Sequence, residues 1–87
     1  MTGKFWYTYI VQCADETLYT GITTDVERRI AQHNCGKGAK YTMRRAPVVL
    51  KYFEKHDNRS AASKREYAIK QLNRMDKIKL AATFQPA

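Results

Sequence analysis

The chain has 87 residues, which is enough for one hydrophobic core and too few for two domains. Its 44% hydrophobic content argues against disorder, and no apolar run approaches the ~20 residues of a membrane-spanning helix. Sixteen Lys and Arg against eight Asp and Glu give a net charge of +8, which favours nucleic acid as a partner, although basic residues also serve solubility alone. We expect one domain over residues 4–82 and a flexible tail at 83–87.

The first predicted elements form a β-hairpin. Residues Phe5 to Cys13 are rich in aromatic and β-branched side chains, which favour a strand. After the short polar segment at residues 14–17, the same composition resumes from Leu18 to Thr23 and predicts an antiparallel partner. Gly21 lies in this second strand, where a glycine indicates a bulge, a strand end or a close backbone approach.

A helix is predicted directly after the hairpin. Thr24 and the glutamate three residues later have the spacing of a capping box, so we expect Thr24 to cap a helix that runs to about Asn34. Arg29 lies at the flank of its apolar face. The helical period places three residues on that face: Val26, Ile30 and His33.

The second half of the chain predicts one more strand and two helices. A loop rich in glycine and basic residues runs over residues 36–46, and Val48 to Lys55 predicts a third strand. A helix is expected from Ser60 to about Asn73, and a short last helix from Asp76 to Thr83. The apolar face of the longer helix comprises Ala61, Ala62, Ala68, Ile69 and Leu72. These elements predict a small α+β fold.

The cysteines and histidines do not indicate a disulfide framework or a zinc site. Two cysteines, Cys13 and Cys35, are too few for such a framework, and no leader-like segment precedes the first strand, so we expect a reduced, cytoplasmic protein. Together with His33 and His56 they could be proposed as zinc ligands. Their spacing lacks the paired pattern of structural zinc sites, which disfavours that interpretation.

Five sequence elements, in order, resemble the GIY-YIG nuclease family. Tyr7-Thr8-Tyr9 stands where the family has its first triplet, and Tyr19-Thr20-Gly21 where it has its second. Arg29 and His33 follow at the family's offsets from the glycine, and Glu66 lies in a helix like the family's metal-binding helix. The chain departs from the family pattern at Tyr7 and Thr8, which replace Gly and Ile, and it lacks a counterpart of the asparagine often found after the glutamate helix.

The resemblance covers most of the chain and is closest to the small bacterial single-domain branch, which has a Gly-Lys-Gly-Ala-Lys loop like that at residues 36–40. It implies a three-stranded antiparallel sheet flanked by helices. It also implies hydrolysis of DNA phosphodiesters that depends on Mg²⁺ or Mn²⁺, linked to DNA repair or recombination.

The residue types of these elements suit phosphodiester hydrolysis, which needs a proton acceptor for water and positive charge on the phosphoryl oxygens. Tyr9 or Tyr19 could accept the proton if Arg29 or a metal ion favoured the phenolate, because a free tyrosine has a pKa of ~10. Arg29 could bind two phosphate oxygens, and His33 could hydrogen-bond a tyrosine or donate to the phosphate. Glu66 could supply an oxygen ligand to the metal ion.

Each candidate also has a purely structural interpretation. Strand tyrosines usually pack, a lone Arg29 usually lies on a solvated helix face, and His33 could be a hydrogen-bonded core histidine. Glu66 could close a capping box with Ser63, although Asn58 offers an earlier cap and would place Glu66 inside the helix. We favour the catalytic interpretation because all the elements occur together at compatible spacings.

The loop and the segment after it carry the predicted DNA contacts. Basic side chains there would bind backbone phosphates and a tyrosine would stack on an unpaired base; the residues are Lys37, Lys40, Tyr41, Arg44 and Arg45. Phosphate contacts do not read sequence, so branched, flapped or single-stranded DNA is the expected substrate. A non-catalytic nucleic-acid-binding module and a subunit of a repair complex are the alternatives.

Overall fold

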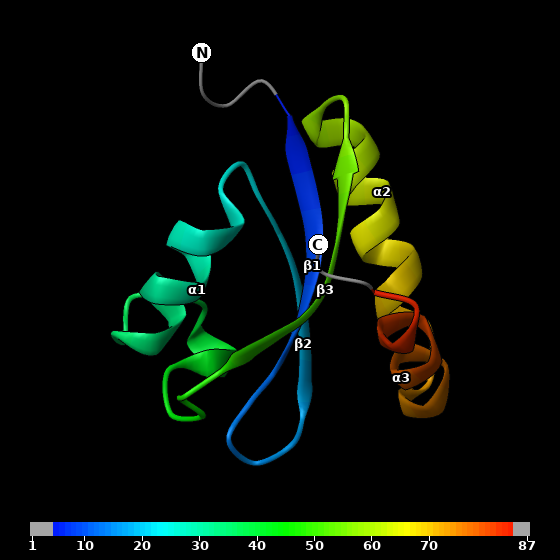
Figure 1. Ribbon diagram of the computed structural model, residues 1–87. Coiled ribbons are helices and arrows are strands. Elements are labelled where there is room, and N and C mark those ends of the chain that lie inside the picture. Colours follow the sequence, from blue (N-terminus) through cyan, green and yellow to red (C-terminus); the bar gives the residue numbers. More distant parts are fainter. Residues whose placement is uncertain (1–4, 85–87) are drawn as a thin grey trace.

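The computed structural model describes residues 5–84. Three strands form an antiparallel sheet in the order β2-β1-β3: β1 (Trp6–Gln12), β2 (Leu18–Thr23) and β3 (Val49–His56). The helices are α1 (Val26–Asn34), α2 (Arg59–Lys70) and α3 (Arg74–Ala82), with a short 3₁₀ helix, η1 (Lys40–Thr42). Figure 1 shows α1 on one face of the sheet and α2 and α3 on the other. The predicted α+β fold, a three-stranded antiparallel sheet flanked by helices, is confirmed.

The central strand β1 is buried on both faces because helices cover both. Successive side chains of a strand point to opposite faces, and the residues from Thr8 to Val11 are at most 1% exposed. Thr8 faces α2, where its hydroxyl donates to the carbonyl oxygen of Ala62 at 3.0 Å. This hydrogen bond satisfies the polar group of a fully buried threonine. Tyr9 points to the other face, toward α1.

The helix starts are set by capping side chains. Asp25, not the predicted Thr24, caps α1: its carboxylate accepts a hydrogen bond from the backbone amide three residues later at 3.1 Å. Asn58 caps α2 in the same way at 2.8 Å. Since α2 is already helical from Arg59, Ser63 and Glu66 are not at its start. The alternative in which Glu66 closes a capping box is therefore excluded.

The predicted boundary between the last two helices is wrong. The sequence pattern places Asn73 at the end of the longer helix, but its side chain caps α3 by accepting from the Asp76 amide at 2.8 Å, so α2 ends at Lys70. The predicted apolar face of α2 is correct at Ala62 and Ile69, which are fully buried, and wrong at Ala68, which is exposed. Neighbouring helical residues point about 100° apart, so Ala68 turns away from the sheet.

The third strand begins one residue later than predicted. Val48 is instead held by the side chain of Asn34, which accepts from its amide at 2.6 Å and donates to its carbonyl at 3.2 Å. At the other end of the chain, Phe84 packs on β3 with its ring centroid 5.1 Å from that of Phe53. The rest of the predicted tail, residues 85–87, lies outside the described part. No helix within residues 5–84 has the length and apolarity to span a bilayer.

Candidate active site

Tyr9 is the centre of the candidate site, on the face of β1 covered by α1. It pairs with Gly21 of β2 and Phe53 of β3 and is 1% exposed. The ring passes over Gly21: a Cβ atom added there would lie 2.6 Å from the Tyr9 hydroxyl oxygen. The glycine of the second triplet therefore makes the room that the tyrosine of the first triplet occupies.

His33 reaches the same hydroxyl from α1. Its Nε2 atom lies 2.8 Å from the Tyr9 hydroxyl oxygen, and its Nδ1 atom lies 2.7 Å from the Thr42 hydroxyl oxygen of η1. His33 and Thr42 are both fully buried. The imidazole is held at both nitrogens, and it links the sheet, α1 and η1 at one point.

Tyr19 completes an aromatic group beside the histidine. Its ring lies edge-on to His33 at 5.6 Å and stacks on Tyr41 at 5.7 Å with an interplanar angle of 23°. The guanidinium of Arg45 lies 4.1 Å from the centroid of the Tyr41 ring. Tyr19 is partly exposed, so of the two candidate tyrosines it is the one with more contact with solvent.

Arg29 and Glu66 lie close enough to Tyr9 to act on its ionisation. Burial raises the pKa of Tyr9 to about 12; the hydrogen bonding and positive charge of Arg29 oppose this rise, and the charges of Tyr19 and Glu66 add to it. Arg29 acts in the direction expected of it from the sequence, but the loss of hydration has the larger effect on the Tyr9 pKa. Tyr9 is a neutral phenol at physiological pH.

Burial and the charge of Arg29 act together on His33 and keep it neutral. Its burial, and then the positive charge of Arg29, lower its pKa below the ordinary value of 6.5. A neutral imidazole has one nitrogen with a proton and one free to accept a proton. This imidazole lies at hydrogen-bonding distance from the Tyr9 hydroxyl.

Glu66 reaches the site from the opposite face of the sheet. Its helix, α2, covers that face, but β2 is an edge strand, and a contact at this edge links the two sides. Lys70 lies one helical turn after Glu66, its Nζ atom 3.1 Å from a Glu66 oxygen and 5.8 Å from the centroid of the Tyr19 ring. The Lys70 ammonium thus contacts both the Glu66 carboxylate and the Tyr19 ring, and Glu66 itself is partly buried.

A divalent cation fits this carboxylate. Within residues 5–84 no group of three His, Cys, Asp or Glu side chains could hold a metal ion. Mg²⁺ commonly uses one or two carboxylates together with water and substrate phosphate, so a single glutamate is a suitable anchor. The carboxylate is paired with the ammonium of Lys70 at 3.1 Å.

Of the predicted DNA-contacting residues, three basic ones are exposed, whereas Arg45 is bound to other residues of the protein. Lys37, Lys40 and Arg44 are all exposed. Arg45 instead forms an ion pair with Asp15 at 3.0 Å and donates to the Tyr41 carbonyl at 2.7 Å. A base that stacked on Tyr41 would have to compete with Tyr19 or with the Arg45 guanidinium.

Four residues near the site were not predicted: Gln32, Gly38, Thr42 and Lys70. Gln32 accepts a hydrogen bond from Arg29 at 2.9 Å. A Cβ atom added at Gly38 would lie 2.2 Å from His33 Nδ1, so only glycine lets the loop pass this close to the ring. In the sequence, the second glycine of the Gly-Lys-Gly loop was the feature that could have predicted this close approach to His33.

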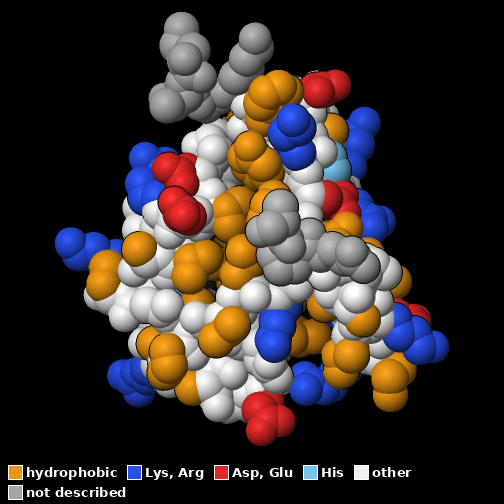
Figure 2. Space-filling view, in the orientation of Figure 1, with side chains coloured by type: hydrophobic (Ala, Val, Ile, Leu, Met, Phe, Trp, Pro, Cys, Tyr) orange, Lys and Arg blue, Asp and Glu red, His pale blue; other side chains and the backbone are white. Residues whose placement is uncertain are grey.

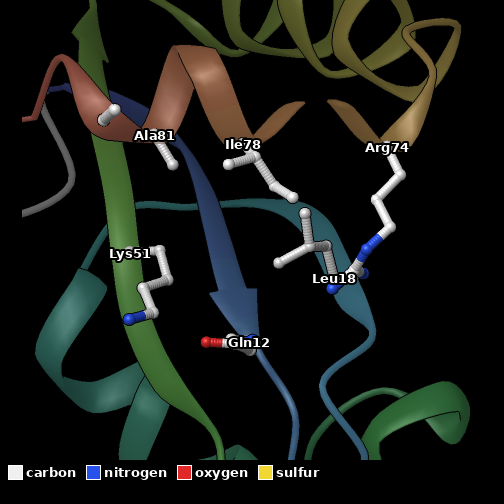
Figure 3. A pocket seen from close by; sticks show the side chains of 7 residues that line it. Gln12, Leu18, Lys51, Arg74, Ile78 and Ala81 are labelled. Atoms are coloured by element: carbon white, nitrogen blue, oxygen red, sulfur yellow. The ribbon is translucent and has the colours of Figure 1, made fainter. Parts of the chain in front are cut away.

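A hollow in the described part of the molecule lies away from these residues. It has a volume of about 340 Å³ and lies between α3 and the ends of the strands; Gln12, Leu18, Lys51, Arg74, Ile78, Ala81 and Ala82 line it. Figure 3 shows Ile78 of α3 pointing toward Leu18 of β2. None of the five candidate site residues lines this hollow.

Comparison with known proteins identifies the family. The family model described as the GIY-YIG catalytic domain matches residues 5–79. The chain belongs to the GIY-YIG family. The GIY-YIG domain is a nuclease fold, which supports an endonuclease-like function acting on nucleic acid.

Relatives of this GIY-YIG protein occur in archaea and bacteria. It is 58% identical over 79 residues to a UPF0213 protein of Haloquadratum walsbyi, covering 91% of this chain and 89% of that protein. A UPF0213 protein of Staphylococcus haemolyticus is 58% identical over 74 residues, 85% of this chain and 90% of its own length. Both are proteins of about the same extent as this chain.

Two solution NMR structures share the GIY-YIG fold described above. A UPF0213 protein of Bacillus halodurans has 43% identity and a TM-score of 0.59 over 91% of this chain and 84% of that one. A protein from E. faecalis has 40% identity and a TM-score of 0.62, covering 100% and 97% of the two chains.

Proposed function

We propose that this GIY-YIG domain is a metal-dependent endonuclease that hydrolyses DNA phosphodiesters by water attack. The observation that carries the proposal is the buried contact between the Tyr9 hydroxyl and His33 Nε2 at 2.8 Å. A phenol with a pKa near 12 is protonated at neutral pH, so by itself it is a poor base. With a neutral imidazole at hydrogen-bonding distance, it can pass its own proton on while it accepts another.

The proton path follows from this pair. As the water oxygen bonds to phosphorus, one water proton moves to the Tyr9 oxygen and the phenolic proton moves to His33 Nε2. The bond between phosphorus and the leaving oxygen breaks, and that oxygen takes up a proton from solvent. Arg29 binds the phosphoryl oxygens, and Tyr19 positions the attacking water. Proton transfer by a positioned side chain typically contributes about 10²–10⁴-fold to rate.

Glu66 would hold the divalent ion, Mg²⁺ or Mn²⁺. When bound, such an ion supplies positive charge to the phosphoryl oxygens and stabilises the charge that develops on them. The carboxylate is partly buried and pairs with Lys70, which also contacts Tyr19 of the edge strand β2, and this placement supports the role. Lys70 keeps the carboxylate paired until the ion is present.

The substrate is branched, flapped or single-stranded DNA. The described part of the molecule spans only 34 × 28 × 26 Å, so it contacts a short stretch of nucleic acid. The basic side chains of Lys37, Lys40 and Arg44 suit phosphate contacts, which position DNA without reading its sequence. A cytoplasmic role in DNA repair or recombination belongs to the same proposal; the free cysteines Cys13 and Cys35 suit a reducing compartment.

A comparison of DNA cleavage by the parent protein and by the Glu66→Ala variant tests the proposal. The parent and the variant are incubated with duplex, single-stranded and branched DNA in Mg²⁺, Mn²⁺ or a chelator. We expect the parent to cut only with a divalent ion, and Glu66→Ala to lose cleavage while its salt-sensitive DNA binding remains. Glu27→Ala, an exposed glutamate on α1, is the matched control and should cut like the parent.

Equal cleavage by Glu66→Ala and the parent would refute the metal-binding role. Binding without any cleavage by the parent, under all metal conditions, would favour the non-catalytic nucleic-acid-binding alternative. Weak binding that rises only when a second protein is added would favour the subunit of a repair complex.

A further inference from the structure

The two hydrogen bonds of His33 determine which of its nitrogens carries the proton. Nε2 faces the Tyr9 hydroxyl at 2.8 Å, and Nδ1 faces the Thr42 hydroxyl at 2.7 Å. His33 and Thr42 are 0% exposed, so solvent does not satisfy either nitrogen. In a neutral imidazole, one of these contacts must use a ring N–H and the other a lone pair.

The Thr42 hydroxyl has only one hydrogen to donate, and a second acceptor competes for it. The carbonyl oxygen of Ala39 lies 2.9 Å from the Thr42 hydroxyl oxygen. If this hydrogen goes to Ala39, then Thr42 accepts from His33 Nδ1–H, and Nε2 accepts from Tyr9. All three contacts are then hydrogen bonds.

The opposite tautomer satisfies fewer groups. With the proton on Nε2, Thr42 would donate to Nδ1 and give up Ala39, and Tyr9 would accept from the ring. The Tyr9 hydroxyl hydrogen would then need another acceptor, and within residues 5–84 the structure shows none at hydrogen-bonding distance. A buried donor without an acceptor costs about 1–3 kcal/mol. We infer that Thr42 is a positioning residue that holds His33 as the Nδ1–H tautomer, with the Nε2 lone pair directed at Tyr9.

The backbone around Thr42 holds this hydroxyl in place. The Thr42 amide donates to Ala39 at 3.0 Å, and the Thr42 carbonyl accepts from the Arg45 amide at 3.0 Å. Gly38 passes so close to the ring that an added Cβ would lie 2.2 Å from Nδ1. The glycine-rich loop and η1 therefore support the histidine, in addition to any contact that the lysines of the loop make with DNA.

The catalytic consequence rests on the function proposed above. With its proton on Nδ1, His33 can receive the phenolic proton of Tyr9 at Nε2. The imidazolium then formed still donates from Nδ1 to Thr42. With its proton on Nε2, the ring would donate to Tyr9 and could not accept its proton. Thr42 thus contributes to the direction of proton transfer although it does not touch the substrate.

Nitrogen-15 NMR of the imidazole rings tests the tautomer without reference to catalysis. The chain has two histidines, so His56→Gln assigns the signals. At neutral pH we expect a protonated Nδ1 and an unprotonated Nε2 at His33 in the parent and in Thr42→Ser, which keeps the hydroxyl. In Thr42→Val, which keeps the shape but not the hydroxyl, the population should shift toward Nε2–H. The opposite tautomer in the parent, or an unchanged tautomer in Thr42→Val, would overturn the inference.

Kinetics with the same variants test the consequence. We expect kcat of Thr42→Val to fall on the order of 10- to 100-fold with little change in KM, and Thr42→Ser to restore it. If Thr42→Val does not fold, Thr42→Ala replaces it in both experiments. An Nδ1–H tautomer in a parent that cleaves no DNA would refute the nuclease proposal and leave the role of Thr42 intact. Equal kcat in active, folded Thr42→Val and parent would refute the catalytic consequence of the tautomer.

Discussion

The ionisation of Tyr9 is decided by its burial more than by its charged neighbour. Arg29 is close and lowers the pKa of the phenol, as the sequence suggested, yet burial raises it to about 12. In the mechanism proposed above, the phenolic proton therefore needs an acceptor within the protein, and His33 Nε2, 2.8 Å from the hydroxyl oxygen, is the group proposed for it. Loss of hydration depends on packing from all sides, so motif spacing could not predict it.

Gly21→Ala should disable the site by displacing Tyr9. The new Cβ would lie 2.6 Å from the Tyr9 hydroxyl oxygen and 3.2 Å from a ring carbon of Tyr19, so the tyrosine must move away from His33. Overpacking of this kind costs about 1–3 kcal/mol of unfolding free energy. Urea unfolding and DNA cleavage are the measurements.

Gly36→Ala is the control for glycine replacement as such. Gly36 has a φ of 82°, and nothing lies within 4 Å of an added Cβ, so alanine there adds backbone strain without a collision. This variant should lose about 1–2 kcal/mol and keep its activity. If Gly21→Ala cleaves DNA as well as Gly36→Ala does, the close approach to Tyr9 is not needed for function.

At the scale of elements, the residues of the candidate site come within reach of one another because β2 is an edge strand. Helix α1 brings Arg29 and His33 to one face of the sheet, while α2 covers the other face and carries Glu66. A wide sheet would separate them. At the edge of a three-stranded sheet, Lys70 of α2 reaches the ring of Tyr19 and pairs with Glu66 at 3.1 Å.

Lys70→Gln should strengthen divalent cation binding. The ammonium occupies one side of the Glu66 carboxylate and neutralises its charge, so its removal leaves the oxygen available to the ion. We expect Mn²⁺ affinity, measured by calorimetry or electron paramagnetic resonance, to rise about two- to fivefold, which is the range of a partly exposed ion pair. Lys64→Gln, an exposed lysine on the same helix, should leave it unchanged. Weaker Mn²⁺ binding by Lys70→Gln than by the Lys64 variant would contradict competition between lysine and metal.

At the scale of the whole molecule, positive charge is spread widely. Figure 2 shows Lys and Arg side chains on all sides of the visible face, with Asp and Glu among them. The net charge of +8 attracts polyanions such as DNA, and the face in Figure 2 does not gather its basic side chains into one patch. We expect the orientation to come from basic side chains of the loop after α1, where Lys37 and Lys40 follow the helix that carries His33.

The double variant Lys37→Ala/Lys40→Ala should bind single-stranded DNA with a weaker dependence on salt. Removal of one phosphate contact reduces the slope of log affinity against log salt by about 0.7, so removal of two should reduce it by about 1.4. Lys64→Ala/Lys79→Ala, which removes the same charge from α2 and α3, is the control. Fluorescence anisotropy titrations between about 50 and 200 mM salt measure both slopes. Equal slopes for the two double variants would exclude a specific phosphate site at the loop.

The sequence by itself determined which segments form strands and helices, and it named the candidate site residues. Strand composition predicted all three strands, and the spacing of Tyr9, Tyr19, Arg29, His33 and Glu66 indicated a common chemistry, because helical and strand periods are local properties of the chain. Helix ends were less predictable, since Asp25 and Asn73 compete with neighbouring capping residues. Only the tertiary structure decided that Thr42 and Gly38 support His33, that burial keeps Tyr9 protonated, and that Lys70 lies beside Glu66. These contacts join residues from separate elements, and their energies depend on desolvation and close packing, which no local pattern records.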